Sequence, residues 1–123
     1  YYEFCGVRGE DAPAPNVQVP EITPRELKVR LDRGDDLFVL DVREPHEYQI
    51  ASIPGAKLIP LNDVPKRVGE LDPNVETIVH CKMGGRSAKA CDFLRANGFK
   101  SVKNTIGGIL AWSDKVDPSV PKY

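Results

Sequence analysis

The segment Thr77-Ile78-Val79-His80-Cys81-Lys82-Met83-Gly84-Gly85-Arg86-Ser87 joins a short apolar stretch to a loop with a glycine pair. Its first residues are mostly β-branched or apolar and contain neither Gly nor Pro, which is typical of a strand buried in a parallel sheet. From Ser87 to Asn97 the apolar side chains recur on one helical face, and Gly98 follows the last turn. The segment therefore predicts a strand, a tight loop and a helix in direct succession.

The same alternation extends along the rest of the chain. Thr23-Pro24-Arg25-Glu26 has the composition of a helix start, with a capping residue, a proline in the first turn and a glutamate three residues on. We expect that helix to end at Gly34. The other predicted elements are a strand at 37–40, short helical pieces within 44–53, a helix at 61–71, a strand at 102–104 and a small helix after Gly107-Gly108. This order predicts an α/β domain with a central, mainly parallel sheet flanked by helices.

Size and charge restrict the function further. The 123 residues suffice for one domain, and a formal net charge of −1 gives no global field that would recruit nucleic acid or an anionic membrane. No apolar run approaches the length of a membrane span, and we see no signal peptide. Three cysteines without close pairing indicate free thiols in a reducing, cytoplasmic environment. With two histidines and no Cys-x-x-Cys pair, we expect no metal site.

Cys81 lies where such a fold binds its ligands, at the carboxyl end of a strand and just before a helix. Successive backbone N–H groups and the positive end of the helix stabilise an anion there. Gly84 and Gly85 permit the tight backbone turn, and Lys82 and Arg86 add cationic groups. These features favour a nucleophilic thiolate over the alternative, a buried structural cysteine.

The loop Cys81-x-x-Gly84-x-Arg86-Ser87 resembles the active-site loop of the rhodanese family. Three further segments are similar to family motifs in the same order: Leu40-Asp41-Val42-Arg43-Glu44 with Glu47-Tyr48, Ile53-Pro54-Gly55-Ala56 with Ile59-Pro60, and Gly107-Gly108 with Trp112. One departure is Ala51-Ser52, where the family usually has Gly-His before the Ile-Pro-Gly-Ala segment. The resemblance spans roughly residues 20–115 and implies a rhodanese-like fold.

The resemblance implies a sulfurtransferase in which Cys81 takes a sulfane sulfur from thiosulfate or a persulfide, for example that of a cysteine desulfurase. The loop residues that would hold the persulfide are Lys82, Met83, Gly84, Gly85, Arg86 and Ser87. Asp41 and Arg43 would brace this loop or line its rim; the alternative is an ordinary surface ion pair. We expect His80 to be a buried or hydrogen-bonded histidine and Cys91 to belong to the core.

Two other classes of function remain open. A Cdc25-like phosphatase or an arsenate reductase would use the same thiolate, but such phosphatases have five residues between Cys and Arg, and here four separate Cys81 from Arg86. The shorter loop suits a single sulfur atom better than a phosphate. The third possibility is a non-catalytic rhodanese-like binding module, against which the retained cysteine argues.

The ends of the chain carry a narrower resemblance. Tyr1-Tyr2-Glu3-Phe4-Cys5-Gly6 looks like the end of an adenylyltransferase domain, and the segment 116–123 resembles the tail of adenylyltransferase/sulfurtransferases of the MoeZ type. We therefore expect a linker at residues 1–20 after a missing adenylyltransferase domain, and a rhodanese domain at 21–123. The implied partner is an ubiquitin-like sulfur carrier protein. ATP and zinc would belong to the missing domain, and we expect no cofactor in this one.

Overall fold

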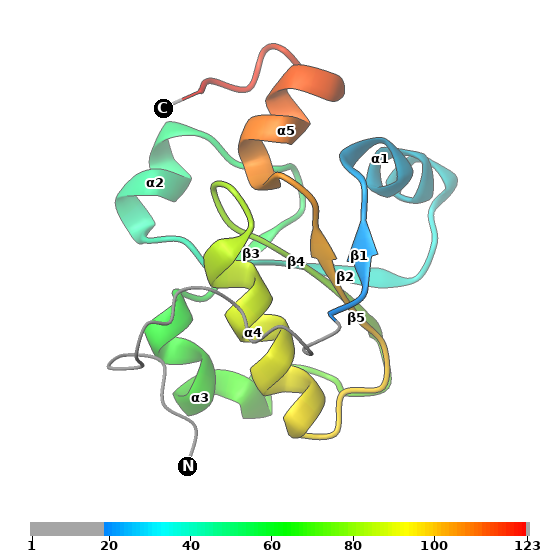
Figure 1. Ribbon diagram of the computed structural model, residues 1–123, viewed down its shortest axis with the longest axis vertical. Helices are drawn as coiled ribbons and strands as arrows, with labels where there is room; N and C mark the ends of the chain where they lie inside the picture. Colours follow the sequence, from blue (N-terminus) through cyan, green and yellow to red (C-terminus); the bar gives the residue numbers. More distant parts are fainter. Residues whose placement is uncertain (1–18, 123) are drawn as a thin grey trace.

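The computed structural model describes residues 19–122, in which strands alternate with helices as the sequence predicts (Figure 1). The segment predicted as a linker, residues 1–20, lies outside this range except for Val19 and Pro20. Cys5, which the narrower resemblance includes, and the terminal Tyr123 also lie outside the described residues.

A single sheet of five strands organises the described chain, in the order β1-β5-β4-β2-β3. Its strands are β1 (Glu21–Ile22), β2 (Leu37–Asp41), β3 (Lys57–Leu58), β4 (Glu76–His80) and β5 (Val102–Thr105). Every pairing is parallel, which confirms the predicted parallel sheet. In the central pair, Asp41 of β2 lies opposite His80 of β4, so both strands end at the same edge of the sheet.

Residues 19–122 also form five α-helices and two short 3-10 segments, of which all but the last helix lie between strands. They are α1 (Pro24–Arg33), α2 (Pro45–Ile50), η1 (Leu61–Asp63), α3 (Val64–Arg67), η2 (Val68–Glu70), α4 (Gly85–Ala96) and α5 (Gly108–Lys115). Helix α1 begins with the predicted capping box between Thr23 and Glu26, and it ends at Gly34, whose φ of 80° is left-handed. The helix predicted at 61–71 is instead three short helical pieces, because Pro65 fits only a first turn and interrupts a continuous helix.

The sheet is buried on both faces, so each central strand sends alternate side chains to two apolar clusters. Leu40 and Val79 belong to the cluster beneath α3 and α4, whereas Val39 and Ile78 belong to the cluster beneath α1 and α5. Figure 1 shows these helix pairs on the two sides of the sheet. This arrangement explains the uninterrupted apolar runs at 37–40 and 77–79. Among the described helices, none has the length and apolar composition that crossing a membrane requires.

Candidate active site

Cys81 follows β4 directly, and its side chain lies inside the loop that leads to α4. The Gly84 N–H donates a hydrogen bond to Cys81 Sγ at 3.0 Å, and the Ser87 hydroxyl oxygen lies 3.4 Å from the same sulfur. Gly84 has a φ of 121°, a conformation that a side chain would strain, and it precedes the first residue of α4. The sulfur therefore lies at a helix N-terminus among N–H and O–H donors, an arrangement that stabilises an anion.

The glycine pair after β5 holds the loop from the other side. The Ile109 N–H donates to the Cys81 carbonyl at 2.9 Å, and the Leu110 N–H donates to the Lys82 carbonyl at 3.2 Å. Gly108 makes this approach possible, because a Cβ at this position would lie 2.5 Å from the Cys81 carbonyl oxygen. The first turn of α5 thus holds the backbone of Cys81 and Lys82 in place.

Arg86 does not point a free charge into the loop; it pairs with Glu47 of α2. The two guanidinium nitrogens Nη1 and Nη2 lie 2.7 and 3.0 Å from the two carboxylate oxygens of Glu47. Glu47 Oε1 also accepts the Glu44 N–H at 2.9 Å, which anchors the carboxylate at the start of α2. The loop is therefore tied to a helix that comes 39 residues earlier in the chain.

Asp41 and Arg43 form a fully buried ion pair. Arg43 Nε donates to Asp41 Oδ1 at 2.8 Å, and Arg43 Nη2 donates to the Ala51 carbonyl at 2.7 Å, at the end of α2. Of the two alternatives left open by the sequence, burial excludes an ordinary surface pair. Arg43 Nη1 also donates to the Glu47 carbonyl, so the pair is bonded to α2, whose Glu47 side chain in turn holds Arg86.

His80 lies beneath the loop and is completely buried, as predicted. Its Nδ1 is 3.4 Å from the Cys81 carbonyl oxygen, and its Nε2 is 3.7 Å from Asp41 Oδ2. Burial lowers the pKa of His80 below its ordinary value of 6.5, while the Asp41 carboxylate opposes that shift. The imidazole is therefore neutral near pH 7.

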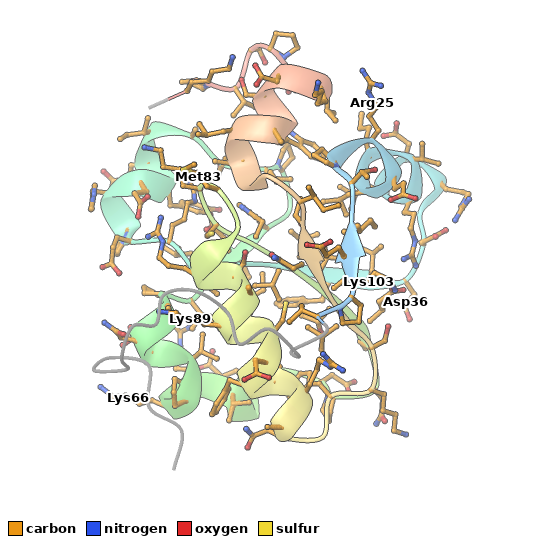
Figure 2. The ribbon with its side chains drawn as sticks, viewed as in Figure 1. Arg25, Asp36, Lys66, Met83, Lys89 and Lys103 are labelled. Carbon is orange, nitrogen blue, oxygen red and sulfur yellow. The ribbon has the colours of Figure 1, made fainter. Side chains whose placement is uncertain are left out.

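The remaining loop residues have different surroundings. Met83 is 68% exposed, and Figure 2 shows it on the loop that precedes α4. Gly85 is the first residue of α4, two residues before the helix start predicted at Ser87. Ser87 is completely buried beside the sulfur. The structure thus brings Cys81, Gly84 and Ser87 together, whereas Arg86 turns toward Glu47 and Met83 toward the surface.

Two residues of this site received no role from the sequence. Glu47 belongs to a motif segment, but its partner Arg86 is distant in the chain. Asn104 of β5 lies against the loop: its Nδ2 donates to the Gly84 carbonyl at 3.2 Å, and its Oδ1 is 2.5 Å from Ser87 Oγ. The sequence could have indicated a role for Asn104, because asparagine is disfavoured in strands and needs hydrogen-bond partners when it is buried.

Cys91 is excluded as a second reactive thiol. It is completely buried on α4, and burial raises its pKa far above the ordinary value for a thiol. Within residues 19–122, no group of three or more His, Cys, Asp or Glu side chains is arranged to hold a metal ion.

A parallel α/β sheet that presents a buried cysteine at a helix N-terminus has the architecture in which a thiolate would be stabilised. The model of the rhodanese-like domain family matches residues 23–115, and this chain belongs to that family. The fold agrees: the rhodanese-like domain protein of Staphylococcus aureus superposes with a TM-score of 0.74 at 33% identity, over 85% of this chain and 99% of that one.

Two curated relatives extend the comparison. The chain is 43% identical over 95% of its length to the rhodanese-like/PpiC domain-containing protein 12 of Arabidopsis thaliana, a chloroplastic protein. It is 38% identical over its whole length to the probable adenylyltransferase/sulfurtransferase MoeZ of Mycobacterium tuberculosis. The chain spans only 40% and 32% of the lengths of these two relatives. It is thus similar to one part of larger proteins, MoeZ-type sulfurtransferases among them.

Proposed function

We propose that this chain is a sulfurtransferase that carries sulfane sulfur as a persulfide on Cys81. The observation that carries the proposal is the position of Cys81 Sγ, 3.0 Å from the Gly84 N–H in a loop of six residues from Cys81 to Arg86. The name of the relative MoeZ, which includes sulfurtransferase, supports the same reaction class. Because the thiol must stay reduced, we place the reaction in the cytoplasm.

The reaction begins when the Cys81 thiolate attacks the sulfane sulfur of the donor. With thiosulfate, a Cys81 S–S bond forms, the donor S–S bond breaks, and sulfite leaves with the electron pair. The Gly84 N–H then faces a persulfide anion, whose charge the N-terminus of α4 stabilises. The loop proposed to surround that anion consists of Lys82, Met83, Gly84, Gly85, Arg86 and Ser87, with the side chains of Met83 and Arg86 turned away from the sulfur.

The pairing of Arg86 favours sulfur over phosphate as the transferred group. A phosphatase uses an arginine to bind two oxygens of a phosphate dianion. Here both terminal nitrogens of Arg86 are already bonded to the carboxylate of Glu47, and a phosphate would have to displace that carboxylate. Together with the short loop, this contact argues against the Cdc25-like and arsenate-reducing alternatives.

For the acceptor we propose the adenylylated C-terminus of an ubiquitin-like sulfur carrier protein. The outer persulfide sulfur would attack the acyl carbon, and AMP would leave. An external thiol would then reduce the remaining S–S bond and release a carrier thiocarboxylate. Similarity to MoeZ over the whole chain supports this acceptor, and it supports an adenylyltransferase domain before the linker at 1–20. That domain, rather than residues 21–123, would hold ATP and zinc.

Intact-protein mass spectrometry after incubation with thiosulfate tests the proposal. We expect wild type to gain one sulfur atom that a reducing thiol removes, and Cys81→Ser to gain none. The matched control is Cys91→Ser, which alters a buried thiol and should still gain the sulfur. A gain that persists in Cys81→Ser would contradict the assignment. No gain in wild type, either with thiosulfate or with a cysteine desulfurase and cysteine, would favour the binding module.

A further inference from the structure

Asn104 is a buried polar side chain in β5 that the reaction described above does not use. Its amide reaches the catalytic loop at two points: Nδ2 donates to the Gly84 carbonyl, and Oδ1 faces Ser87 Oγ. The amide orientation is fixed, because the Gly84 oxygen is only an acceptor and must face Nδ2. Asn104 therefore contacts the two residues that also contact Cys81 Sγ, Gly84 and Ser87.

The Ser87 hydroxyl has a single proton and three neighbouring acceptors. They are the Gly84 carbonyl at 3.1 Å, Asn104 Oδ1 at 2.5 Å and Cys81 Sγ at 3.4 Å. The Gly84 oxygen already accepts the Ala88 N–H at 3.1 Å and the Asn104 amide at 3.2 Å, which use its two lone pairs. The hydroxyl proton is thus left to Asn104 or to the sulfur.

We propose that Asn104 is a positioning residue of the sulfur-transfer site, which determines whether the Ser87 hydroxyl donates to Asn104 or to the Cys81 sulfur. This rests on the proposed function for the identity of the reacting anion. It assigns to Asn104 a role that acts through Ser87, without contact between Asn104 and the sulfur.

Two hydrogen-bond patterns follow from the proton count. When Cys81 is a thiol, its S–H donates to Ser87 Oγ, and the hydroxyl donates to Asn104 Oδ1. When the sulfur is a thiolate or a persulfide anion, it has no proton to donate, and the hydroxyl rotates to donate to it. The anion then receives two donors, Gly84 N–H and Ser87 O–H. Asn104 competes with the anion for the second donor.

Two titratable groups near the sulfur have other surroundings. His80 is neutral and contacts the Cys81 carbonyl, and burial raises the pKa of Cys91, which keeps that thiol protonated. Arg86 pairs with Glu47. The Ser87 hydroxyl, 3.4 Å from Sγ, is a side-chain donor within reach of the sulfur.

The test is the pH dependence of Cys81 alkylation by iodoacetamide in the full chain, resolved by peptide mass spectrometry. Asn104→Asp keeps the shape of the side chain, replaces the donor to the Gly84 carbonyl by an oxygen, and accepts the Ser87 proton more strongly. We expect it to raise the pH midpoint by about one unit. Asn104→Ala removes Oδ1, so the hydroxyl divides between the sulfur and the Gly84 carbonyl, which has lost its Asn104 donor, and we expect the midpoint to fall. If Asn104→Asp does not fold, Asn104→Ala alone tests whether Asn104 competes with the sulfur for the Ser87 proton.

The same substitutions in a Ser87→Ala background separate the proposed role from a structural one. Without the hydroxyl, Asn104→Ala should no longer lower the pH midpoint of alkylation. Asn104→Asp should raise that midpoint by at most half as much as it does when Ser87 is present. Equal shifts in both backgrounds, or a rise in Asn104→Ala, would overturn the proposal. An exposed control, Asn62→Asp, should leave the midpoint unchanged. Alkylation requires only a thiolate, so this result is independent of whether the chain transfers sulfur.

Discussion

The guanidinium of Arg86, in the catalytic loop, forms a two-point ion pair with the carboxylate of Glu47, in α2. The carboxylate is almost completely buried, and the guanidinium is about one-third exposed, with relative accessibilities of 9% and 34%. The pair is therefore shielded more than a surface salt bridge, and it fixes a loop that must hold an anion in one geometry. The Glu47 carboxylate also neutralises the positive charge of Arg86, which a phosphatase would use to bind phosphate.

Glu47→Gln should slow persulfide formation without unfolding the protein. Glutamine keeps the size of the side chain and an acceptor for the Glu44 N–H, but it no longer balances the charge of Arg86. We expect kcat/KM for thiosulfate to fall by about tenfold, because small displacements of a catalytic group are costly. The matched control is Glu70→Gln, which weakens the exposed Arg67–Glu70 pair and should leave the rate unchanged. A normal rate in Glu47→Gln would show that the pair does not position the loop.

Arg43→Met should be strongly destabilising, because it leaves the Asp41 carboxylate buried without its partner. Removal of one member of a buried ion pair costs about 3 to 5 kcal/mol. The double variant Asp41→Asn, Arg43→Met removes both charges and should lose less stability than Arg43→Met alone. Urea unfolding of the single and double variants measures this coupling. Additive losses would show that the two charges do not stabilise each other.

Local sequence determined most of the fold, and the strands that were missed depend on distant contacts. Thr23 and Glu26 form their capping box within one turn, so composition alone located the start of α1. The two-residue strands β1 and β3 could not be predicted, because they exist only through pairing with β5 and β2. Such short segments carry no periodicity.

The candidate site divides in the same way. Cys81 and Gly84 lie within one loop, and their sequence pattern indicated that the Gly84 backbone and the Cys81 side chain belong to one site. By contrast, Ser87 and Asn104 are 17 residues apart, and Arg86 and Glu47 are 39 apart. These pairs depend on how α2 and β5 pack beside α4. A pattern within one segment cannot specify such a contact.

Gly108→Ala should displace the catalytic loop. Gly108 has a φ of 60°, and an added Cβ would collide with the carbonyl groups of Cys81 and Lys82. We expect a loss of at least about 2 kcal/mol in the free energy of unfolding, together with slower alkylation of Cys81. Gly69→Ala is the matched control, since no atom lies within 4 Å of its added Cβ. If Gly108→Ala changed stability but not alkylation, α5 would support the fold without shaping the loop.

His80 predicts how the stability of the fold depends on pH. Because burial lowers the pKa of His80 in the folded state, the unfolded chain binds its proton first as the pH falls below 6.5. The folded state therefore loses stability below that pH, by up to about 1.4 kcal/mol per pH unit, until the pH reaches the folded pKa. Carboxylates with a lowered pKa also make the free energy of unfolding depend on pH, but in a lower range. Glu76, whose pKa is about 2, contributes only below its ordinary value of 4.5.

His80→Gln should remove this loss between pH 6.5 and 5, which urea unfolding at several pH values measures. Glutamine does not titrate, so the free energy of unfolding of His80→Gln should stay constant between pH 6.5 and 5, where that of wild type declines. The exposed His46 provides the control, because His46→Gln should retain the wild-type decline. A decline of equal slope in His80→Gln would mean that another group takes up the proton. The buried imidazole beneath Cys81 would then not limit the acid stability of the fold.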